Sequence, residues 1–218
     1  MGRPRSADYE AKRRRILEVA APLFARHGYD RTSLAMIGAA AGVAKSLVYH
    51  YYRDKDAVLA DLLRRHLEEL VAAVEAVAVP DDRPPERRLA DMAVALLEHY
   101  RNADAEHEVQ IAHLKLLPEP VREELYALER RLVRLFTDAL LAVEPALAGD
   151  RRHLKPLVMS LFGMLNWAFL WFREDGPMDR RSYAELATRL VIGGARAIAA
   201  ERAAAAEDAR RPVAQAAS

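Results

Sequence analysis

The chain of 218 residues contains no cysteine. Disulfide bonds, thiolate metal ligands and cysteine nucleophiles are therefore excluded, which suits a reducing cytoplasm. Long uncharged runs are also scarce, and the longest, Pro156–Phe172, has 17 residues. As a helix it would span about 25 Å, less than the hydrocarbon core of a bilayer, so we expect it to be buried in protein. We expect no secretory signal, because the basic N-terminus lacks an apolar segment with a cleavage site.

Motifs of catalysis are missing as well. The sequence has no Gly-rich phosphate loop and no nucleophile elbow, so we predict that the protein is not an enzyme and needs no cofactor. We also predict no metal site. The seven histidines are scattered, although His99, His107 and His113, with Glu106 and Glu108 nearby, leave a metal site open as an alternative.

Charge is distributed unevenly along this almost neutral chain. Residues 1–55 carry eleven Lys and Arg against five Asp and Glu, whereas the whole chain has a net charge of only +1. A basic end joined to an acidic remainder is typical of a module that binds a polyanion. Arg3 and Arg5 belong to this end, and we expect them in a disordered arm when no polyanion is bound.

Thr32–Lys55 has the pattern of two short helices joined by a tight turn. The first helix can start at Thr32 or Ser33, because a hydroxyl there can accept a bond from an early backbone N–H. Gly42 then ends it, since glycine readily adopts the left-handed backbone that a sharp turn requires. A second helix starts near Ala44. This pattern predicts a helix-turn-helix, in which the second helix lies in the major groove of DNA.

The second helix, from Ala44 to about Tyr51, has an inward and an outward set of side chains. Val48 points inward, and the outward set is Lys45, Ser46, Leu47, Tyr49 and His50. Lys45 can donate to guanine or to a phosphate, Ser46 can bond either, and Leu47 can contact a thymine methyl group. Packing in the protein core is the alternative role for Leu47.

The segment from Ile16 to Leu63 resembles the N-terminal DNA-binding domain of the tetracycline-repressor-like (TetR) family of bacterial regulators. The matching residues, in the family's order and spacing, are Ala20, Leu23, Phe24, Gly28, Tyr29, Thr32, Ser33, Ile37, Gly42, Val43, Tyr49, Tyr52 and Lys55. Three residues depart from the family pattern. Gly38 stands in place of the usual alanine, Ser46 in place of a common glycine or proline, and Tyr52 in place of the usual phenylalanine.

The resemblance implies contacts to DNA phosphates. Tyr49 would donate its hydroxyl to a phosphate, and core packing is the alternative for this residue. Lys55, at the start of the next helix, would bind a phosphate with help from the partial positive charge of that helix N-terminus. Thr32 and Ser33, which begin the helix pair, complete the set of candidate DNA contacts.

The rest of the chain shows helical periods and proline stops but no strand alternation, so we predict an all-α fold. An N-terminal three-helix helix-turn-helix domain, residues 1–55, precedes a larger helical ligand-binding and dimerisation domain, residues 56–202. The alanine-rich tail, 203–218, is expected to be disordered. The expected C-terminal helices are 54–77, 86–101, 108–117, 121–143, 153–173 and 181–201.

The last two of these helices each carry an apolar stripe. One consists of Leu154, Leu157, Val158, Leu161, Phe162, Leu165 and Phe169, the other of Tyr183, Leu186, Ala187, Leu190, Val191, Gly194 and Ile198. Pairing both helices with their copies in a second subunit would make a four-helix bundle, and the resemblance also implies a homodimer. The alternative is that both stripes are buried inside one chain.

A second apolar face on the helix 153–173 consists of Met164, Trp167 and Trp171, with Arg173 at its end. This surplus predicts a small-molecule cavity. Leu161–Pro177 is similar to the effector domains of TetR members that respond to acyl-coenzyme A thioesters. That similarity implies that the Trp pair lines the acyl part and that Arg173 faces the phosphates. Core packing of the Met and Trp side chains is the alternative.

Together these observations predict a cytoplasmic transcription regulator that is homodimeric and does not associate with a membrane. It would be a repressor, released from a near-palindromic DNA operator when a small apolar or acyl-CoA-type effector binds. The alternative is a helical ligand-binding or scaffolding dimer whose basic end binds polyanions without sequence preference.

Overall fold

The computed structural model describes the backbone of residues 3–101 and 103–210, with side chains from residue 9 to residue 209 apart from residue 102. In this part of the chain nine α-helices and three short 3₁₀ helices are present, and no strand. The predicted all-α fold is confirmed. Contacts divide the chain into two units, one made of residues up to Val71 with Tyr100–Arg130 and the other of Ala72–His99 with residues from Arg131 on. We had expected a boundary after residue 55.

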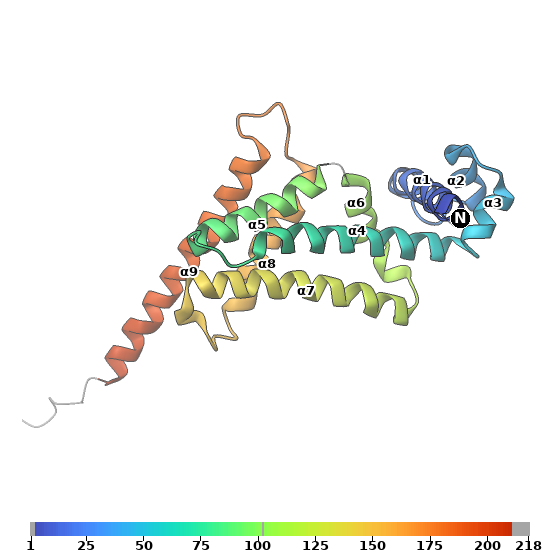
Figure 1. Cartoon of the computed structure of the whole chain (residues 1–218). Coiled ribbons are helices and arrows are strands. Elements are labelled where there is room, and N and C mark those ends of the chain that lie inside the picture. The colour runs from blue at the N-terminus through green and yellow to red at the C-terminus, as the bar shows by residue number, and fades with distance from the viewer. Residues whose placement is uncertain (1–2, 102, 211–218) are drawn as a thin grey trace, which may run out of the picture. The chain divides into compact units, whose positions relative to one another are not determined.

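The N-terminal unit begins with three helices, α1 (Arg3–His27), α2 (Leu34–Ala41) and α3 (Lys45–Tyr51). Figure 1 shows α2 and α3 next to α1. The helix α1 begins at Arg3, so the backbone of the expected arm is helical, whereas the side chains of Arg3 and Arg5 lie outside the described residues.

Local signals set the ends of the helix pair. Ser33 caps α2, because its hydroxyl oxygen accepts a bond from the Met36 backbone N–H at 3.2 Å. Gly42 ends α2 with a left-handed φ of 69°, which allows the sharp turn into α3. The predicted helix-turn-helix is therefore present at the expected residues.

Three further segments complete the N-terminal unit. They are the first part of α4 (Lys55–Ala78), all of α6 (Asp104–His113) with the 3₁₀ turn Leu114–Leu116, and the first part of α7 (Glu119–Val143). The helix α6 begins four residues earlier than predicted. Its first turn contains Asp104 and Glu106, and acidic side chains stabilise a helix N-terminus.

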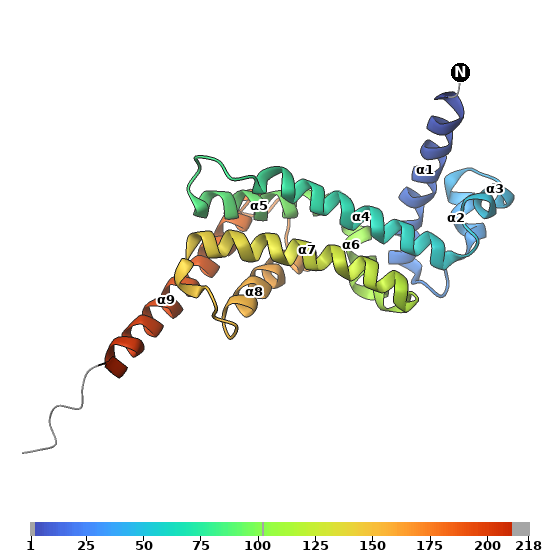
Figure 2. The same cartoon turned by 60° about the horizontal axis from the view of Figure 1, so that its bottom comes forward.

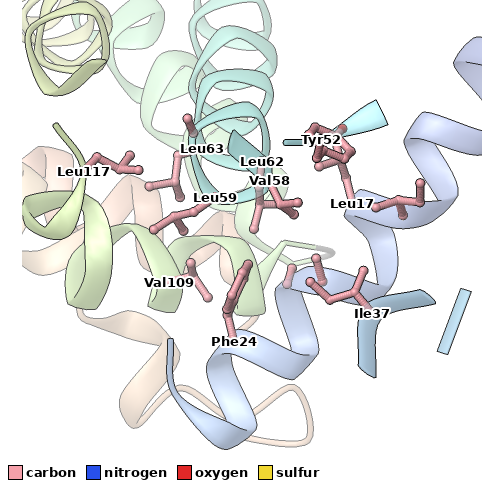
Figure 3. Packing of buried hydrophobic residues seen from close by; sticks show 14 of the residues in the cluster. Leu17, Phe24, Ile37, Tyr52, Val58, Leu59, Leu62, Leu63, Val109 and Leu117 are labelled. Atoms are coloured by element: carbon pink, nitrogen blue, oxygen red, sulfur yellow. The ribbon is translucent and has the colours of Figure 1, made fainter. Parts of the chain in front are cut away.

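The core of the N-terminal unit joins α1, α2 and α3 to α4, α6 and α7. Figure 3 shows part of this cluster, in which Phe24, Ile37, Val58 and Leu59 are completely buried. Val109 of α6 belongs to the same cluster. Burying one such side chain contributes about 1.5–3 kcal/mol to the free energy of folding, so the apolar cluster holds the helix pair firmly in the N-terminal unit.

The C-terminal unit begins with the last part of α4 and α5 (Pro85–Tyr100) except its last residue. It continues with the later part of α7, a 3₁₀ turn at Pro145–Leu147, α8 (Leu154–Asn166), a 3₁₀ turn at Ala168–Leu170 and α9 (Arg180–Arg210). The main contact in this unit is between α8 and α9. Ala187 and Val191 of α9 are buried, as are Val158 and Leu161 of α8. A Cβ atom on Gly194 would lie 3.6 Å from the Leu157 side chain, so this glycine is close to α8.

The end of α8 differs from the prediction of one helix over residues 153–173. The helix ends at Asn166, and Trp167 has φ −91° and ψ 0°. The carbonyl of Met164, in the last turn of α8, accepts a hydrogen bond at 2.9 Å from the hydroxyl of Tyr183. Tyr183 comes from α9, and its hydroxyl satisfies a carbonyl that has no partner in α8 because the helix ends here.

The helix α9 is longer than predicted, because it continues to Arg210 instead of ending near residue 201 (Figure 2). Residues 203–210 are therefore helical, although we expected disorder from residue 203 on. Alanine has the highest helix propensity, and four alanines follow Arg202. The expected disorder of residues 211–218 lies outside the described residues. None of the described helices has the length and apolarity needed to cross a membrane.

Candidate nucleic-acid interface

The outward face of α3 presents polar and basic side chains to solvent. Lys45, Ser46, Tyr49 and His50 are exposed, whereas Val48 is completely buried. Leu47 is half-buried, so part of its side chain packs on the protein and part faces solvent. The ammonium of Lys45 lies 5.6 Å from the centre of the Tyr49 ring. Hydrogen-bond donors and a cation on one short helix match the chemistry of base edges and phosphates in the major groove.

Tyr49 is 50% exposed, which is incompatible with core packing. Its hydroxyl is therefore available to a ligand such as a phosphate. The next tyrosine, Tyr51, has a different role, because its ring lies 4.5 Å from the ring of Tyr9 on α1. Two tyrosines two residues apart thus face opposite sides, one toward solvent and one toward α1.

Thr32 does not present its side chain to solvent, which corrects its assignment as a candidate DNA contact. It is 1% exposed, and its hydroxyl donates to the carbonyl of Gly28 at 2.9 Å. The hydroxyl therefore stabilises the loop between α1 and α2. Ser33 is exposed and accepts the capping bond described above, so its hydroxyl proton remains available for a DNA phosphate.

The side chain of Lys55 has partners within the protein, and its phosphate contact stays a prediction. Its ammonium donates to the carbonyls of Tyr29 at 2.8 Å and Asp30 at 3.2 Å, and it lies 4.1 Å from the centre of the Tyr29 ring. Asp56 accepts a further bond from the Tyr29 hydroxyl. The first turn of α4 therefore binds the loop between α1 and α2. The lysine chain reaches backbone carbonyls more than 20 residues away, which the sequence pattern did not reveal.

Exposed arginines near the helix pair add positive charge. They were counted among the basic residues of 1–55, but they were assigned no role from the sequence. Arg31 is exposed and donates to the carbonyl of His27 at 2.8 Å. Arg53, directly after α3, has an 83% exposed side chain paired with Asp54. Such side chains can neutralise phosphates on either side of the reading helix.

The four candidate effector residues are not gathered on one helix face. Met164 is half-buried in α8, whereas Trp167 and Trp171 lie beyond the end of α8 and are 53% and 56% exposed. Arg173 is 77% exposed and pairs with Asp175 at 3.2 Å. The ring of Trp171 packs edge-on against Tyr183 at 5.0 Å. Three of the four candidate side chains are therefore more than half exposed in the single chain.

A buried polar cluster in the N-terminal unit was missed by the sequence analysis. Tyr100 stacks on His107 at 4.0 Å between ring centres, and His66 lies 6.3 Å from both rings. Nearby, Gln110 donates to Glu129 at 2.8 Å, and burial raises the pKa of the Glu129 carboxyl. The sequence did contain one signal for this cluster, because His66 lies between leucines that helical spacing places in the core. Among the described residues no group of three or more His, Asp and Glu is arranged to hold a metal ion.

Two family models match this chain. Residues 16–62 match "Bacterial regulatory proteins, tetR family", and residues 82–195 match "Tetracyclin repressor-like, C-terminal domain". The HTH-type transcriptional repressor KstR2 of Mycobacterium tuberculosis is 24% identical over 191 residues, which cover 84% of this chain and 92% of KstR2.

Solved structures have the same fold. A TetR-family transcriptional regulator from Bordetella parapertussis matches with a TM-score of 0.76 and 35% identity, covering 82% of this chain and 93% of that one. AibR in complex with isovaleryl coenzyme A and operator DNA matches with a TM-score of 0.67 and 23% identity, covering 82% and 97%. The chain therefore belongs to the TetR family of bacterial regulatory proteins, which are DNA-binding transcription regulators and not enzymes.

Proposed function

We propose that this regulator is a homodimeric repressor that reads a near-palindromic operator with α3. The observation that carries the proposal is the exposed row Lys45, Ser46, Tyr49 and His50 on a helix whose opposite face is buried through Val48. Lys45 and Ser46 are assigned to base edges, and Tyr49 and the hydroxyl of Ser33 to phosphates. The repressor KstR2 supports the direction of regulation. Because the target is chromosomal DNA, we also propose a cytoplasmic location.

Apolar side chains exposed on the C-terminal unit support the proposed homodimer. They are Val79, Met159, Trp167, Leu170, Trp171, Met178 and Leu190. Exposed apolar side chains of this size favour an interface, and a second copy would cover them with the same surface. A dimer would place two α3 helices on half-sites separated by about one turn of DNA, 34–36 Å.

For the effector, we propose a small molecule with an apolar part, of which an acyl-CoA thioester is the specific candidate. AibR, which shares the fold, binds isovaleryl coenzyme A, and the candidate contacts are Met164, Trp167, Trp171 and Arg173. The rings of Trp167 and Trp171 are about half covered, so a bound acyl chain or a partner subunit would cover more of them. The positive charge of Arg173 suits the phosphates of coenzyme A.

Selection of bound sequences from random DNA duplexes, followed by a salt titration, tests the DNA-binding proposal. We expect an affinity about 10³-fold or more above that for random duplex, together with a steep fall of affinity with salt. If the affinity for DNA falls with salt but shows no sequence preference, the result would support the alternative, a ligand-binding or scaffolding dimer with a polyanion-binding end.

Tryptophan fluorescence tests the effector proposal, because the chain has only two tryptophans. We expect isovaleryl coenzyme A to change their emission at constant dimer concentration and to weaken binding to the selected duplex. Free coenzyme A is the matched control, since it carries the phosphates without the acyl chain. An equal response to both compounds would contradict an acyl-specific site.

A further inference from the structure

Asp61 on α4 is a buried carboxylate that accepts hydrogen bonds from two other elements. Arg13 of α1 donates to it twice, from Nε at 2.9 Å and from Nη2 at 2.5 Å. Tyr52, directly after α3, donates its hydroxyl to Asp61 Oδ2 at 2.5 Å. We call these three residues the Asp61 junction. All of them belong to the N-terminal unit, so one carboxylate joins α1, α4 and the end of the reading helix.

The hydrogen bonds of the Asp61 junction are charge-assisted, because their acceptor is a carboxylate. Asp61 is 7% exposed, and a buried carboxylate is stable only when it is paired and hydrogen-bonded. The two-point contact from Arg13 fixes direction as well as distance. Burial and the bond to Asp61 raise the pKa of the Tyr52 phenol, so this hydroxyl remains a donor at ordinary pH. The bond to Asp61 likewise raises the pKa of Arg13, which stays charged.

The helix α3 has few other anchors. It contains seven residues, of which only Val48 is fully buried, and Ala44 provides no side-chain cap at its start. The burial of Val48 is favourable in many orientations, because apolar contact has little directionality. A hydrogen bond at the C-terminal end constrains both distance and angle. The Tyr52 hydroxyl, together with the ring contact between Tyr51 and Tyr9, therefore restricts how far α3 can tilt.

We propose that Asp61 is a positioning residue for sequence reading, because its carboxylate fixes the end of α3 through the Tyr52 hydroxyl. This inference rests on the proposed reading of DNA by α3. Phosphate contacts tolerate a small tilt of the helix, whereas base contacts need side chains within about 0.5 Å of their place. The Asp61 junction also gives a role to Tyr52, since the phenylalanine usual in the TetR family has no hydroxyl to donate.

The substitution Tyr52→Phe tests the proposal, because it removes one hydroxyl and leaves the buried ring. The wild-type protein first selects its duplex from a random pool. The affinities of both proteins for the selected duplex and for random duplex are then measured well below the melting temperature of each. We expect the preference for the selected duplex to fall about tenfold, comparable to one mismatched base pair. The affinity for random duplex is expected to stay unchanged, because the phosphate contacts remain.

Asp61→Leu provides a second, linked variant, because leucine is close to aspartate in size and has no oxygen to accept the Tyr52 hydroxyl. It should reduce the preference at least as much as Tyr52→Phe, and combining the two should add little, because both remove the same bond. Tyr126→Phe is the matched control, since this partly buried tyrosine packs on the same core from α7. It should leave the preference unchanged.

The results of these binding measurements distinguish a failure of the Asp61 proposal from a failure of the proposed DNA-binding function. If folded Tyr52→Phe keeps the full preference, Asp61 is not a positioning residue, whatever its effect on the melting temperature. Equal loss of affinity for selected and random duplex would also contradict the proposal, because it would indicate general damage to the domain. A wild-type protein that selects no sequence would overturn the proposed function itself.

Discussion

At the residue scale, the exposed side chains of α3 divide by the group on DNA that each can reach. Lys45 and Ser46 lie in the first turn, which in a helix-turn-helix meets base edges. Tyr49 lies one turn later and is half exposed, so its hydroxyl suits a phosphate beside the groove. Base specificity should therefore be concentrated at the start of α3.

The substitution Lys45→Ala should relax sequence preference at one base step, because Lys45 is assigned to a base edge. The loss of such a contact costs about 1–3 kcal/mol of discrimination. Selection from random duplexes by the variant measures the change. Arg53→Ala is the matched control, since it removes an exposed positive charge just after α3 and should weaken binding to all sequences alike. An unchanged sequence profile for Lys45→Ala would mean that Lys45 contacts only a phosphate.

The roles of individual residues were predictable where the relevant partner is near in sequence. The burial of Val48 follows from helical spacing, and the cap at Ser33 follows from a hydroxyl before an apolar helix. The hydrogen bonds of Thr32 and Lys55 could not be predicted, because they go to backbone carbonyls of a folded loop. Backbone carbonyls accept bonds from any donor, so they leave no signature in the amino-acid sequence.

Glu129 gives a prediction about stability and pH. Burial, the main cause, raises the pKa of its carboxyl, so the charged form destabilises the folded state above that pKa. Glu129→Gln should therefore raise stability at pH 8. The new amide can also donate to Gln110 Oε1, a buried oxygen that accepts no bond from the described residues. The gain should be about 1 kcal/mol, or about 2–4 °C in melting temperature.

The pH dependence distinguishes this cause from others. As pH falls below the raised pKa of Glu129, the wild-type carboxyl becomes neutral and loses its penalty, so the advantage of Glu129→Gln should shrink. Thermal melts at a series of pH values from 8 down to about 4, near the ordinary pKa of a glutamate, measure the difference. Glu124→Gln is the control, because this exposed residue on the same helix pairs with Arg64 at the surface. A lower melting temperature for Glu129→Gln at pH 8 would contradict the assignment.

At the element scale, Gly38 determines how closely α2 and α3 approach each other. A Cβ atom at Gly38 would lie 3.1 Å from Val48 Cγ2 and 3.3 Å from the carbonyl oxygen of Val43. Both contacts are shorter than ordinary van der Waals distances, and Val48 is completely buried. The glycine therefore allows α3 to sit against α2, at a cost to helix propensity of about 1 kcal/mol relative to alanine.

The substitution Gly38→Ala should consequently fail to stabilise the protein, because crowding against Val48 offsets the gain in propensity. It should also weaken binding to the selected duplex, since α3 must shift by a few tenths of an ångström. Thermal melts and binding assays measure the two effects. Ala39→Gly, at an exposed position of the same helix, is the control and should lower stability by up to about 1 kcal/mol. A more stable Gly38→Ala variant with full affinity would show that α3 adapts freely.

The bounds of elements were predictable where the ending signal is local. Gly42 ends α2 and Pro85 begins α5 within a residue of the prediction. The end of α8 was not predictable, because the bond that satisfies Met164 comes from Tyr183 on another helix. The apolar run continues to Phe172 and therefore predicted one helix over 153–173, whereas α8 ends at Asn166.

At the scale of the whole molecule, the boundary between the two units falls within the long helices α4 and α7, whereas we predicted a boundary at residue 55. Val109 of α6 and Leu125 of α7 are buried in the same cluster as Phe24 of α1. The three N-terminal helices alone form a small unit that buries limited apolar surface, and residues more than 80 positions away complete its core. The family and fold could be predicted from local motifs, but the extent of this unit depends on contacts distant in sequence.

The homodimer gives the prediction that concerns the assembled protein. Leu190 lies on α9 and is 60% exposed in one chain, so the proposed interface would bury it. Leu190→Arg would place a charge in that interface without a partner, and the charge would appear twice by symmetry. We expect the dissociation constant of the dimer to rise at least about a hundredfold, equivalent to about 2.8 kcal/mol. Light scattering over a range of concentrations measures this change.

Leu116→Arg provides the matched control, because Leu116 is a similarly exposed leucine in the N-terminal unit. It should leave the dimer intact. Leu190→Arg should also lose most of its affinity for a duplex with two half-sites, since a single α3 then binds alone, while its affinity for a single half-site should be unchanged. If the dissociation constant of the Leu190→Arg dimer equals that of the wild-type dimer, the interface lies elsewhere, because an unpaired arginine could not be buried there twice without loss of affinity.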